Sequence, residues 1–466
     1  MNKTVVIDIV GLSASLLGEH MPFLTQYITG RHLTYIKPVL PAVTTTAQSC
    51  YLTGKWPSEH GIVGNGWYDR DDAEVKFWKQ SNRLVQAEKI WERAKRDDPT
   101  FTCSKMFWWY NMYASVDYSV TPRPQYHADG LKMPDCYAHP AALRDELTAK
   151  LGTFPLFSFW GPKTNLSSSR WIADASMYVD DQHNPTLTLI YLPHLDYGLQ
   201  KFGVDFAKIA GDLREIDNLV AELVAFYEKK EARIILLSEY GINNVSRPVY
   251  INRVLREAGL IQVRTEAGRE LLDAGASAAF AAPDHQIAHV YVNDPAQIPR
   301  VKALLASVPG VAEVLDEVGK KAHHLNHDRS GDLVAVADPD SWFAYYYWLD
   351  DAKKPDYAQV VDIHRKPGYD PAELFLDQTN PLIQAKAGYK LARKLLGFRY
   401  LMDVISLDAT LVKGSHGGVN IGREYYPVLI TDQPAKQPEL EAIDVYDVIW
   451  NHLNAPVLQP VRAENA

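Results

Sequence analysis

The chain has little cysteine: Cys50, Cys103 and Cys136 are the only three among 466 residues. An odd and widely spaced set does not form a disulfide framework, and it lacks the paired spacing of cysteine zinc sites. We therefore expect reduced thiols, as in a cytoplasmic protein. With 47% hydrophobic and 23% charged residues, the chain is long enough for one large domain with an insertion, or for three domains.

Long apolar runs, internal repeats and a surplus of positive charge are also missing. No run reaches the roughly 20 residues that cross a bilayer, and the first residues lead into Thr4–Asp8 without the apolar stretch of a signal peptide. The net charge of −9 argues against a nucleic-acid-binding surface, but not against a small anionic substrate held by metal. We expect a soluble cytoplasmic protein, with a frayed tail after Pro456.

Strand-like and helix-like segments alternate along the chain. Val5–Ile7, Thr186–Leu192 and Ala232–Ser238 are apolar runs typical of buried strands, and the amphipathic segment Phe206–Lys229 leads into the last of them. This order predicts a mostly parallel sheet with helices on both faces. Ligands of such sheets collect beyond the carboxyl ends of the strands.

An acid follows each of these three runs. Asp8, Asp196 and Glu239 would then share one edge of the sheet. A single acid after a strand is commonplace, so each position has an ordinary explanation. Three of them together indicate a shared cation site as the other interpretation.

The stretch from Pro41 to Gly54 has the order of a strand end, a helix start and a helix stop. Thr44 would lie at the helix N-terminus, among unpaired N–H groups and at the positive end of the helix dipole, where a phosphate is favoured. Thr44 is therefore either a candidate nucleophile or an ordinary helix cap, since Ser and Thr are standard caps. Asn65, in the following loop, can donate two hydrogen bonds.

Two later segments carry candidate side chains. Trp108, Trp109 and Tyr110 follow a predicted strand and would either border a substrate pocket or pack in the core. Glycines on both sides of His416 allow the backbone to approach a site and the imidazole to point into it. Taken alone, this second signal is weak.

The pattern of predicted strands and helices changes near residue 246. Residues 247–330 predict a compact α+β unit, inserted between 1–246 and 331–466, and Gly331–Ala337 predicts a strand that returns to the main sheet. His285 and His289 are four residues apart on a predicted strand. At ~3.3 Å per residue they are about 13 Å apart, too far to share an ion.

Set together, these segments resemble the alkaline phosphatase superfamily and, within it, the type I phosphodiesterase/nucleotide pyrophosphatase family. The resemblance rests on the order of its motifs: Asp8, Pro41–Thr44, Thr53–Gly54, Pro57–Asn65, Asp196, Glu239 and His416. Its most specific part runs from Pro41 to Asn65, and it favours Thr44 as a nucleophile over a plain cap. The implied fold is an alkaline-phosphatase-like α/β core with a small α+β cap.

The resemblance implies two divalent ions, commonly zinc. It assigns Asp8, Thr44, Glu239 and Tyr240 to one ion, and Asp196, Gln200 and His416 to the other. Such a pair of ions lowers the pKa of the attacking hydroxyl, so that Thr44 would attack phosphorus and form a phospho-enzyme that water resolves. Asn65 and the backbone N–H after Thr44 would bind a non-bridging oxygen.

The sequence departs from the family pattern at two metal ligands, since Tyr240 and Gln200 stand where the family has histidine. Oxygen ligands favour Mn²⁺ or Mg²⁺ over zinc. His194 and His364 are candidates for replacement ligands. Loss of two imidazoles also leaves open a catalytically inactive protein that binds a metal or ligand.

We predict a metal-dependent hydrolase of phosphoric esters, with phosphodiesters or pyrophosphates favoured, acting on a small phosphorylated substrate as a monomer or homodimer. A phosphonate hydrolase or phosphomonoesterase of the same superfamily is the alternative. A sulfatase is disfavoured, because Thr44 occupies its nucleophile position and Cys50 lacks the neighbouring Pro and Arg of the sulfatase signature.

Overall fold

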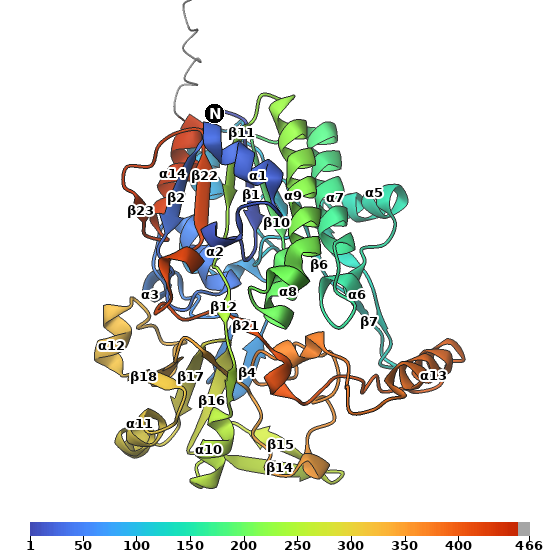
Figure 1. Ribbon diagram of the computed structural model, residues 1–466, viewed down its shortest axis with the longest axis vertical. Helices are drawn as coiled ribbons and strands as arrows, with labels where there is room; N and C mark the ends of the chain where they lie inside the picture. Colours follow the sequence, from blue (N-terminus) through green and yellow to red (C-terminus); the bar gives the residue numbers. More distant parts are fainter. Residues whose placement is uncertain (455–466) are drawn as a thin grey trace, which may run out of the picture.

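The computed structural model describes residues 1–454, so the tail after Pro456 lies outside the described residues. A nine-stranded sheet forms the centre of the larger part of the molecule (Figure 1). In spatial order its strands are β23 (Glu439–Leu440), β2 (His32–Ile36), β22 (Val428–Thr431), β11 (Arg233–Leu237), β1 (Thr4–Ile9), β10 (Leu187–Leu192), β5 (Cys103–Met106), β6 (Tyr118–Pro122) and β9 (Cys136–His139). The strands from β11 to β6 are parallel neighbours, which confirms the predicted mostly parallel sheet.

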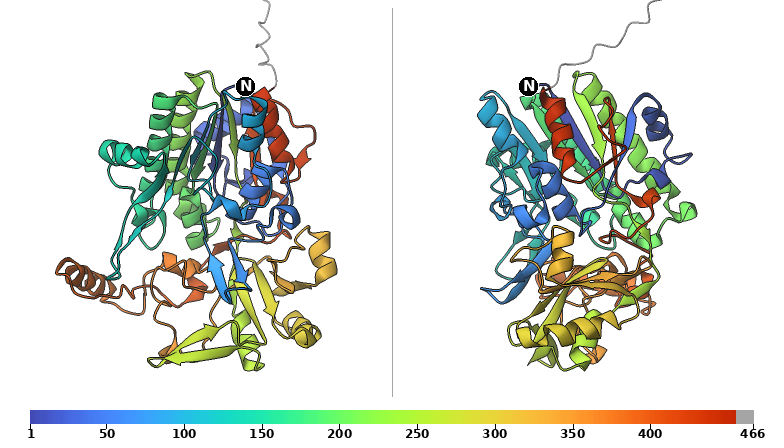
Figure 2. Two further views of the ribbon diagram at one scale, coloured as in Figure 1. Left: turned by 180° about the vertical axis from the view of Figure 1, so that it is seen from behind. Right: turned by 90° about the vertical axis from the view of Figure 1, so that its left-hand side faces the viewer.

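Helices cover both faces of this sheet, as the alternating pattern predicts (Figure 2). Helices α7 and α9 pack together on one face, whereas α2 and α14 pack together on the other. The helices of this part are α1 (Pro22–Tyr27), α2 (Thr44–Thr53), α3 (Pro57–His60), α4 (Ile90–Asp97), α5 (Ala141–Leu151), α6 (Leu156–Phe159), α7 (Ser167–His183), α8 (His194–Phe202), α9 (Phe206–Glu228) and α14 (Asp444–Asn454). Val5–Ile7 at the centre of the sheet are fully buried.

A smaller α+β part, the cap, lies beyond the carboxyl edge of the main sheet (Figure 1). Its antiparallel sheet has the order β16 (Ala279–Asp284), β17 (Ile287–Val292), β19 (Leu333–Ala337) and β18 (Val311–Leu315). Its helices are α10 (Ile251–Glu257), α11 (Ile298–Ala306) and α12 (Glu317–Ala322). The hairpin of β3 (Gly66–Asp69) and β4 (Glu74–Phe77) packs on it, with the Tyr68 ring 4.9 Å from the Phe280 ring.

The strand predicted at 331–337 belongs to the cap, so the prediction that it returns to the main sheet is wrong. Strand β19 lies between β17 and β18, with Val334 opposite both His289 and Leu315. The cap sheet therefore continues past residue 330, and the chain rejoins the main sheet only at β22. All five residues of β19 are buried and apolar. Such a run fits any buried sheet, and its sequence does not say which one.

The remaining elements are short or lie at the periphery. They are β7 (Gln125–Tyr126), β8 (Lys132–Met133), β12 (Asn243–Asn244), β13 (Arg247–Val249), β14 (Gln262–Glu266), β15 (Arg269–Asp273), β20 (Ser341–Phe343), β21 (Gly414–Ser415) and α13 (Ile383–Leu395). Helix α13 projects from the side of the molecule (Figure 1). Within residues 1–454, no helix has the length and apolar character needed to cross a membrane.

Candidate active site

The three acids that follow predicted strands meet at the carboxyl edge of the main sheet. Asp8 is the fifth residue of β1 and lies opposite Leu237, the last residue of β11. Glu239 follows two residues later, and Asp196 lies in the first turn of α8, directly after β10. Because β1, β10 and β11 are parallel neighbours, their carboxyl ends bring these side chains together.

Asp8 and Glu239 form a buried pair of carboxylates, each no more than 1% exposed. Burial raises the pKa of Glu239 to about 7, and burial together with the neighbouring Glu239 raises the pKa of Asp8. Gln48 donates its side-chain N–H groups to Asp8 Oδ2, at 3.4 Å, and to Glu239 Oε1. The Gln48 amide has this orientation because its oxygen accepts the Trp109 backbone N–H at 2.7 Å.

The other oxygen of each carboxylate lies outside the contacts of Gln48. Among residues 1–454, nothing donates a hydrogen bond to Asp8 Oδ1 or Glu239 Oε2, although both atoms are buried. Unpaired buried carboxylate oxygens are costly unless a cation compensates them. Asp8 and Glu239, with the neighbouring Thr44 hydroxyl, are therefore a ligand set that fits one hard divalent ion.

Thr44 is the first residue of α2 and is 4% exposed. Its hydroxyl oxygen lies 3.4 Å from the Tyr240 hydroxyl. The next backbone N–H, of Thr45, donates to Asn65 Oδ1 at 3.2 Å. This N–H is therefore taken by the Asn65 side chain, which folds back onto the helix start, and its expected role in binding a phosphoryl oxygen stays a prediction. Asn65 Nδ2 has a second N–H to offer.

Asp196 lies at the centre of a separate hydrogen-bonded group. Its Oδ2 accepts a hydrogen bond from Gln200 Nε2 at 2.7 Å, and its Oδ1 accepts one from the Tyr240 hydroxyl at 3.2 Å. The Gln200 oxygen accepts the Tyr369 hydroxyl at 2.9 Å. Burial raises the pKa of Asp196 to about 6, and these hydrogen bonds offset only part of that effect.

His416 lies in a column of stacked rings next to Asp196. Its ring stacks on Tyr240, with 3.5 Å between centroids, and approaches His285 at 3.8 Å; His285 in turn stacks on Tyr369 at 3.7 Å. His416 Nδ1 lies 2.7 Å from the Ala42 carbonyl oxygen, whereas its buried Nε2 has no hydrogen-bond partner within residues 1–454. This Nε2 lies 4.0 Å from Asp196 Oδ1.

The cap contributes two residues that sequence reasoning missed. Asp284 ends β16, and its carboxylate accepts the Asn65 backbone N–H at 2.8 Å and Asn65 Nδ2 at 3.1 Å. His285 follows at the turn with a φ of 62°, and its Nδ1 lies 2.9 Å from Asp284 Oδ1. An acid and an imidazole side by side, directly before the strand predicted at 286–292, were the available signal. Pairing His285 with His289 missed it, since His289 instead contacts the Val63 carbonyl at 2.8 Å.

The two candidate replacement ligands lie in other contacts. His194 is two residues before Asp196 on α8, so the two side chains point about 200° apart around the helix. Its Nε2 lies 3.2 Å from Glu215 and 3.9 Å from Asp212, both on α9. His364 Nδ1 lies 3.2 Å from the Phe77 carbonyl oxygen. The structure therefore gives neither imidazole the place of a replacement ligand at Asp196 or Glu239.

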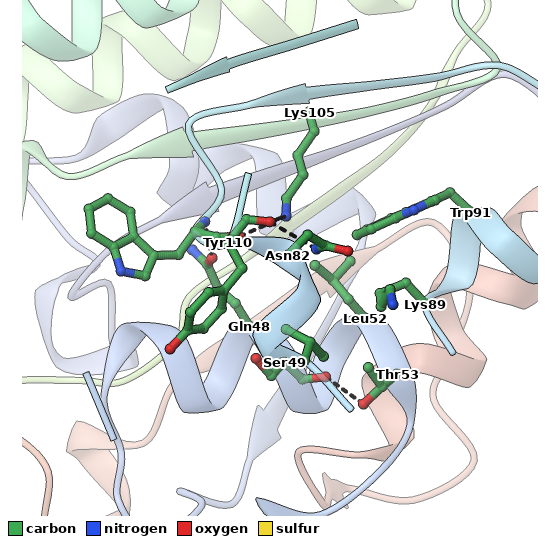
Figure 3. A pocket seen from close by; sticks show the side chains of 11 residues that line it. Gln48, Ser49, Leu52, Thr53, Asn82, Lys89, Trp91, Lys105 and Tyr110 are labelled. Atoms are coloured by element: carbon green, nitrogen blue, oxygen red, sulfur yellow. Dashed lines mark hydrogen bonds between the residues drawn. The ribbon is translucent and has the colours of Figure 1, made fainter. Parts of the chain in front are cut away.

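The aromatic stretch after β5 packs inside the protein. Trp108 is fully buried in the core of the main sheet, and Trp109 and Tyr110 are 6% and 3% exposed in the core of the cap. Lys105 Nζ donates to the carbonyl oxygens of Trp109 and Tyr110 at 2.7 and 2.9 Å (Figure 3). Beside them lies a cavity of about 10 Å³, lined also by Gln48, which has room for about one water molecule. The packing alternative describes this stretch better than a substrate-pocket wall.

Comparison with known sequences assigns the chain to a family. The sequence model described as type I phosphodiesterase / nucleotide pyrophosphatase matches residues 4–370. An uncharacterised pyrophosphatase/phosphodiesterase of Schizosaccharomyces pombe is 24% identical over 281 residues, 58% of this chain and 50% of that protein. Ectonucleotide pyrophosphatase/phosphodiesterase 2 of Saccharomyces cerevisiae is 21% identical over 270 residues, 52% and 48% of the two chains. The chain thus spans about half the length of these curated relatives.

Solved structures share the fold. Phosphonoacetate hydrolase from Sinorhizobium meliloti, in complex with phosphonoformate, has a TM-score of 0.61 at 15% identity and covers 97% of this chain and 96% of its own. Inactive murine ectonucleotide pyrophosphatase/phosphodiesterase 5, in complex with AMP, has a TM-score of 0.58 at 13% identity, with 98% and 96% covered. Identities this low show the fold alone. Because the family model extends from β1 to the loop that carries Tyr369, the chain belongs to the type I phosphodiesterase/nucleotide pyrophosphatase family.

Proposed function

We propose that the chain hydrolyses phosphoric esters, phosphodiesters or pyrophosphates in particular, by attack of Thr44 on phosphorus. The observation that carries this proposal is the position of Thr44. Its hydroxyl lies at the N-terminus of α2, next to Glu239, which forms a buried carboxylate pair with Asp8. Family membership supports the same reaction class. The likeness to a phosphonate-binding structure is one of fold alone, so phosphonates enter only as test substrates.

In the first step, Thr44 attacks phosphorus and the leaving group departs. The Thr44 oxygen forms a bond to phosphorus while the bond from phosphorus to the leaving oxygen breaks. The Thr44 hydroxyl gives up its proton to water as it attacks. Glu239, whose carboxylate interacts with that hydroxyl, is an ion ligand in this proposal and holds the hydroxyl in place.

Asn65 and water complete the cycle. The free N–H of Asn65 Nδ2 donates to a non-bridging oxygen as negative charge develops on it, while Asp284 holds the amide in place. Water then attacks the phospho-threonine, and the Thr44 oxygen leaves and regains a proton. When bound, a divalent ion at Asp8, Glu239 and Thr44 would neutralise the carboxylates and lower the pKa of the Thr44 hydroxyl.

Turnover by the Thr44→Ala variant tests this proposal. The purified chain is assayed with bis(p-nitrophenyl) phosphate, a dinucleoside pyrophosphate and an alkyl phosphonate, each with Mn²⁺, Zn²⁺ or Mg²⁺. We expect Thr44→Ala to lower kcat by about 10³-fold or more, as for loss of other nucleophiles. Thr44→Ser keeps a hydroxyl and should retain part of the activity. Thr53→Ala, which removes a hydroxyl at the other end of α2, is the matched control.

Two results would count against the proposal. Full activity in Thr44→Ala would refute the nucleophile. A folded wild-type protein that turns over none of these substrates with any ion would favour the inactive binding protein instead.

A further inference from the structure

We infer that the chain binds a single divalent ion, at Asp8 and Glu239, and that hydrogen bonds around Asp196 take the place of the second ion. The inference builds on the ion position used in the proposed function. It concerns how many ions bind, and it can be tested without turnover.

Gln200 presents a donor to Asp196, not a ligand atom. Its Nε2 lies 2.7 Å from Asp196 Oδ2, and its oxygen is taken by the Tyr369 hydroxyl at 2.9 Å. The two contacts together define the orientation of the amide. An amide nitrogen does not ligate a divalent cation, because hard cations take oxygen ligands. Turning the oxygen inward would break the bond to Tyr369 and leave that buried hydroxyl without its acceptor.

Tyr240 also acts as a donor at this position. Its hydroxyl donates to Asp196 Oδ1 at 3.2 Å, and its ring is held face to face on His416, with 6° between the planes. Both oxygens of Asp196 therefore have hydrogen-bond donors, which stabilise the carboxylate as charged partners do. These two donors compensate part of the burial of Asp196 without an ion.

Too few ligands remain for an ion at the second position. Asp196 Oδ1 and His416 Nε2 lie 4.0 Å apart there. His285, stacked on His416, also has a buried Nε2 without a hydrogen-bond partner, but within residues 1–454 it forms no group of three ligand atoms with these two residues. Catalytic zinc ions take three protein ligands, and Mn²⁺ or Mg²⁺ takes more ligands still. A two-ligand position bounded by two donors does not meet that need.

The first position has the opposite character. Asp8 Oδ1 and Glu239 Oε2 are buried acceptors without donors among residues 1–454. Gln48 places its N–H groups on the other oxygens of the same carboxylates, so it supports the pair and leaves these two atoms available. Two carboxylates and a hydroxyl form an oxygen ligand set, which favours Mn²⁺ or Mg²⁺.

Counting ions on the full-length protein tests the inference. The chain is stripped with a chelator, reloaded with Mn²⁺, passed through a desalting column and analysed for metal by mass spectrometry and for Mn²⁺ coupling by electron paramagnetic resonance. We expect one ion per chain and the spectrum of an isolated Mn²⁺. Asp8→Asn should lose this ion, whereas Asp196→Asn should keep it.

Restoring imidazoles should create the missing position. A Gln200→His, Tyr240→His double variant returns to each position the imidazole of the family pattern and removes both donors from Asp196. It is expected to bind two ions per chain and to show a spin-coupled Mn²⁺ spectrum. His194→Ala removes the imidazole beside Asp212 and Glu215, the other cluster with ligand-like spacing. It should leave the count at one, which shows that the ion counted is not bound there.

The outcomes separate this inference from the proposed function. Two ions on the wild-type chain, with one lost in Asp196→Asn, would overturn the inference even if Thr44-dependent hydrolysis is found. No ion on the folded wild-type chain, or one that Asp8→Asn retains, would overturn it too. One ion with no hydrolysis would support the inference and count against the proposed function.

Discussion

Asn65 and Asp284 join the main part of the molecule to the cap. Asp284 accepts both the backbone N–H and the side-chain N–H of Asn65, at 2.8 and 3.1 Å, and both residues are buried. Asn65 also accepts the Thr45 N–H at the start of α2. The cap therefore positions the Asn65 side-chain amide at the start of the candidate nucleophile's helix, and contributes to the site without itself supplying the nucleophile.

A double-mutant cycle tests this relationship. Asp284→Ala removes two hydrogen bonds to a buried group, so we expect it to lower the free energy of unfolding by about 2–4 kcal/mol. Combined with Asn65→Ala, the two changes should be non-additive by about 1–3 kcal/mol, measured by urea unfolding. In hydrolysis of bis(p-nitrophenyl) phosphate, Asp284→Ala should lower kcat more than it raises KM, because it misplaces Asn65.

The control lies in the same cap. Asp332 accepts the Val292 N–H at 2.7 Å but is 28% exposed at its side chain, and Asp332→Ala should leave kcat unchanged. Asp284→Ala in the Asn65→Ala background should cause little further loss of kcat. Fully additive losses of stability and activity would contradict a positioning role.

Lys366 is predicted to be essential for stability. Its Nζ lies 2.6 Å from Asp370 and 2.7 Å from Glu373, and all three side chains are at most 2% exposed. Lys366→Met leaves two buried carboxylates without their cation, which should lower the free energy of unfolding by about 3–5 kcal/mol. The same loop carries Tyr369, so the Gln200 contact should loosen as well.

An exposed ion pair provides the matched control. Lys55 and Glu59 are 2.9 Å apart, with side chains 51% and 47% exposed. Lys55→Met should change the free energy of unfolding by less than about 0.5 kcal/mol, because water screens such pairs. If the two lysine substitutions lower the free energy of unfolding equally in chemical denaturation, the buried contacts of Lys366 with Asp370 and Glu373 stabilise the fold no more than an exposed ion pair does.

Lys105 predicts a pH dependence of stability. Burial lowers the pKa of Lys105 from 10.5 to about 7. Between these values the folded chain lacks a proton that the unfolded chain holds, so this group makes stability rise with pH, by at most about 1.4 kcal/mol per pH unit. The neutral amine still donates to the carbonyls of Trp109 and Tyr110, so the loop is retained.

The pKa of Lys105 is tested by comparing the free energy of unfolding of wild type with that of Lys105→Met. The free energy of unfolding of wild type minus that of Lys105→Met should increase from pH 7 to pH 9. Subtraction removes the contributions of groups that titrate in both chains. A difference that stays flat or falls over this range would contradict a depressed pKa at Lys105.

Local patterns in the sequence determined most of the main sheet and the start of the site. The runs that became β1, β10 and β11 are continuous apolar segments, because parallel strands are buried on both faces. Thr44 begins α2 and Gly54 ends it with a φ of 63°, since a helix start and a left-handed helix end each depend on a few neighbouring residues. The acids after these strands share an edge because parallel strands end on one side.

Tertiary structure alone decided which sheet β19 joins, which cap residue holds Asn65 and which atom Gln200 turns towards Asp196. These features depend on partners far apart in the chain: Asp284 is 219 residues from Asn65, and Tyr369 is 169 residues from Gln200. A glutamine side chain can offer either a donor or an acceptor at one position. Its sequence position shows that the histidine of the family pattern is missing, whereas only the Tyr369 hydroxyl on its oxygen shows that Gln200 presents an N–H donor to Asp196.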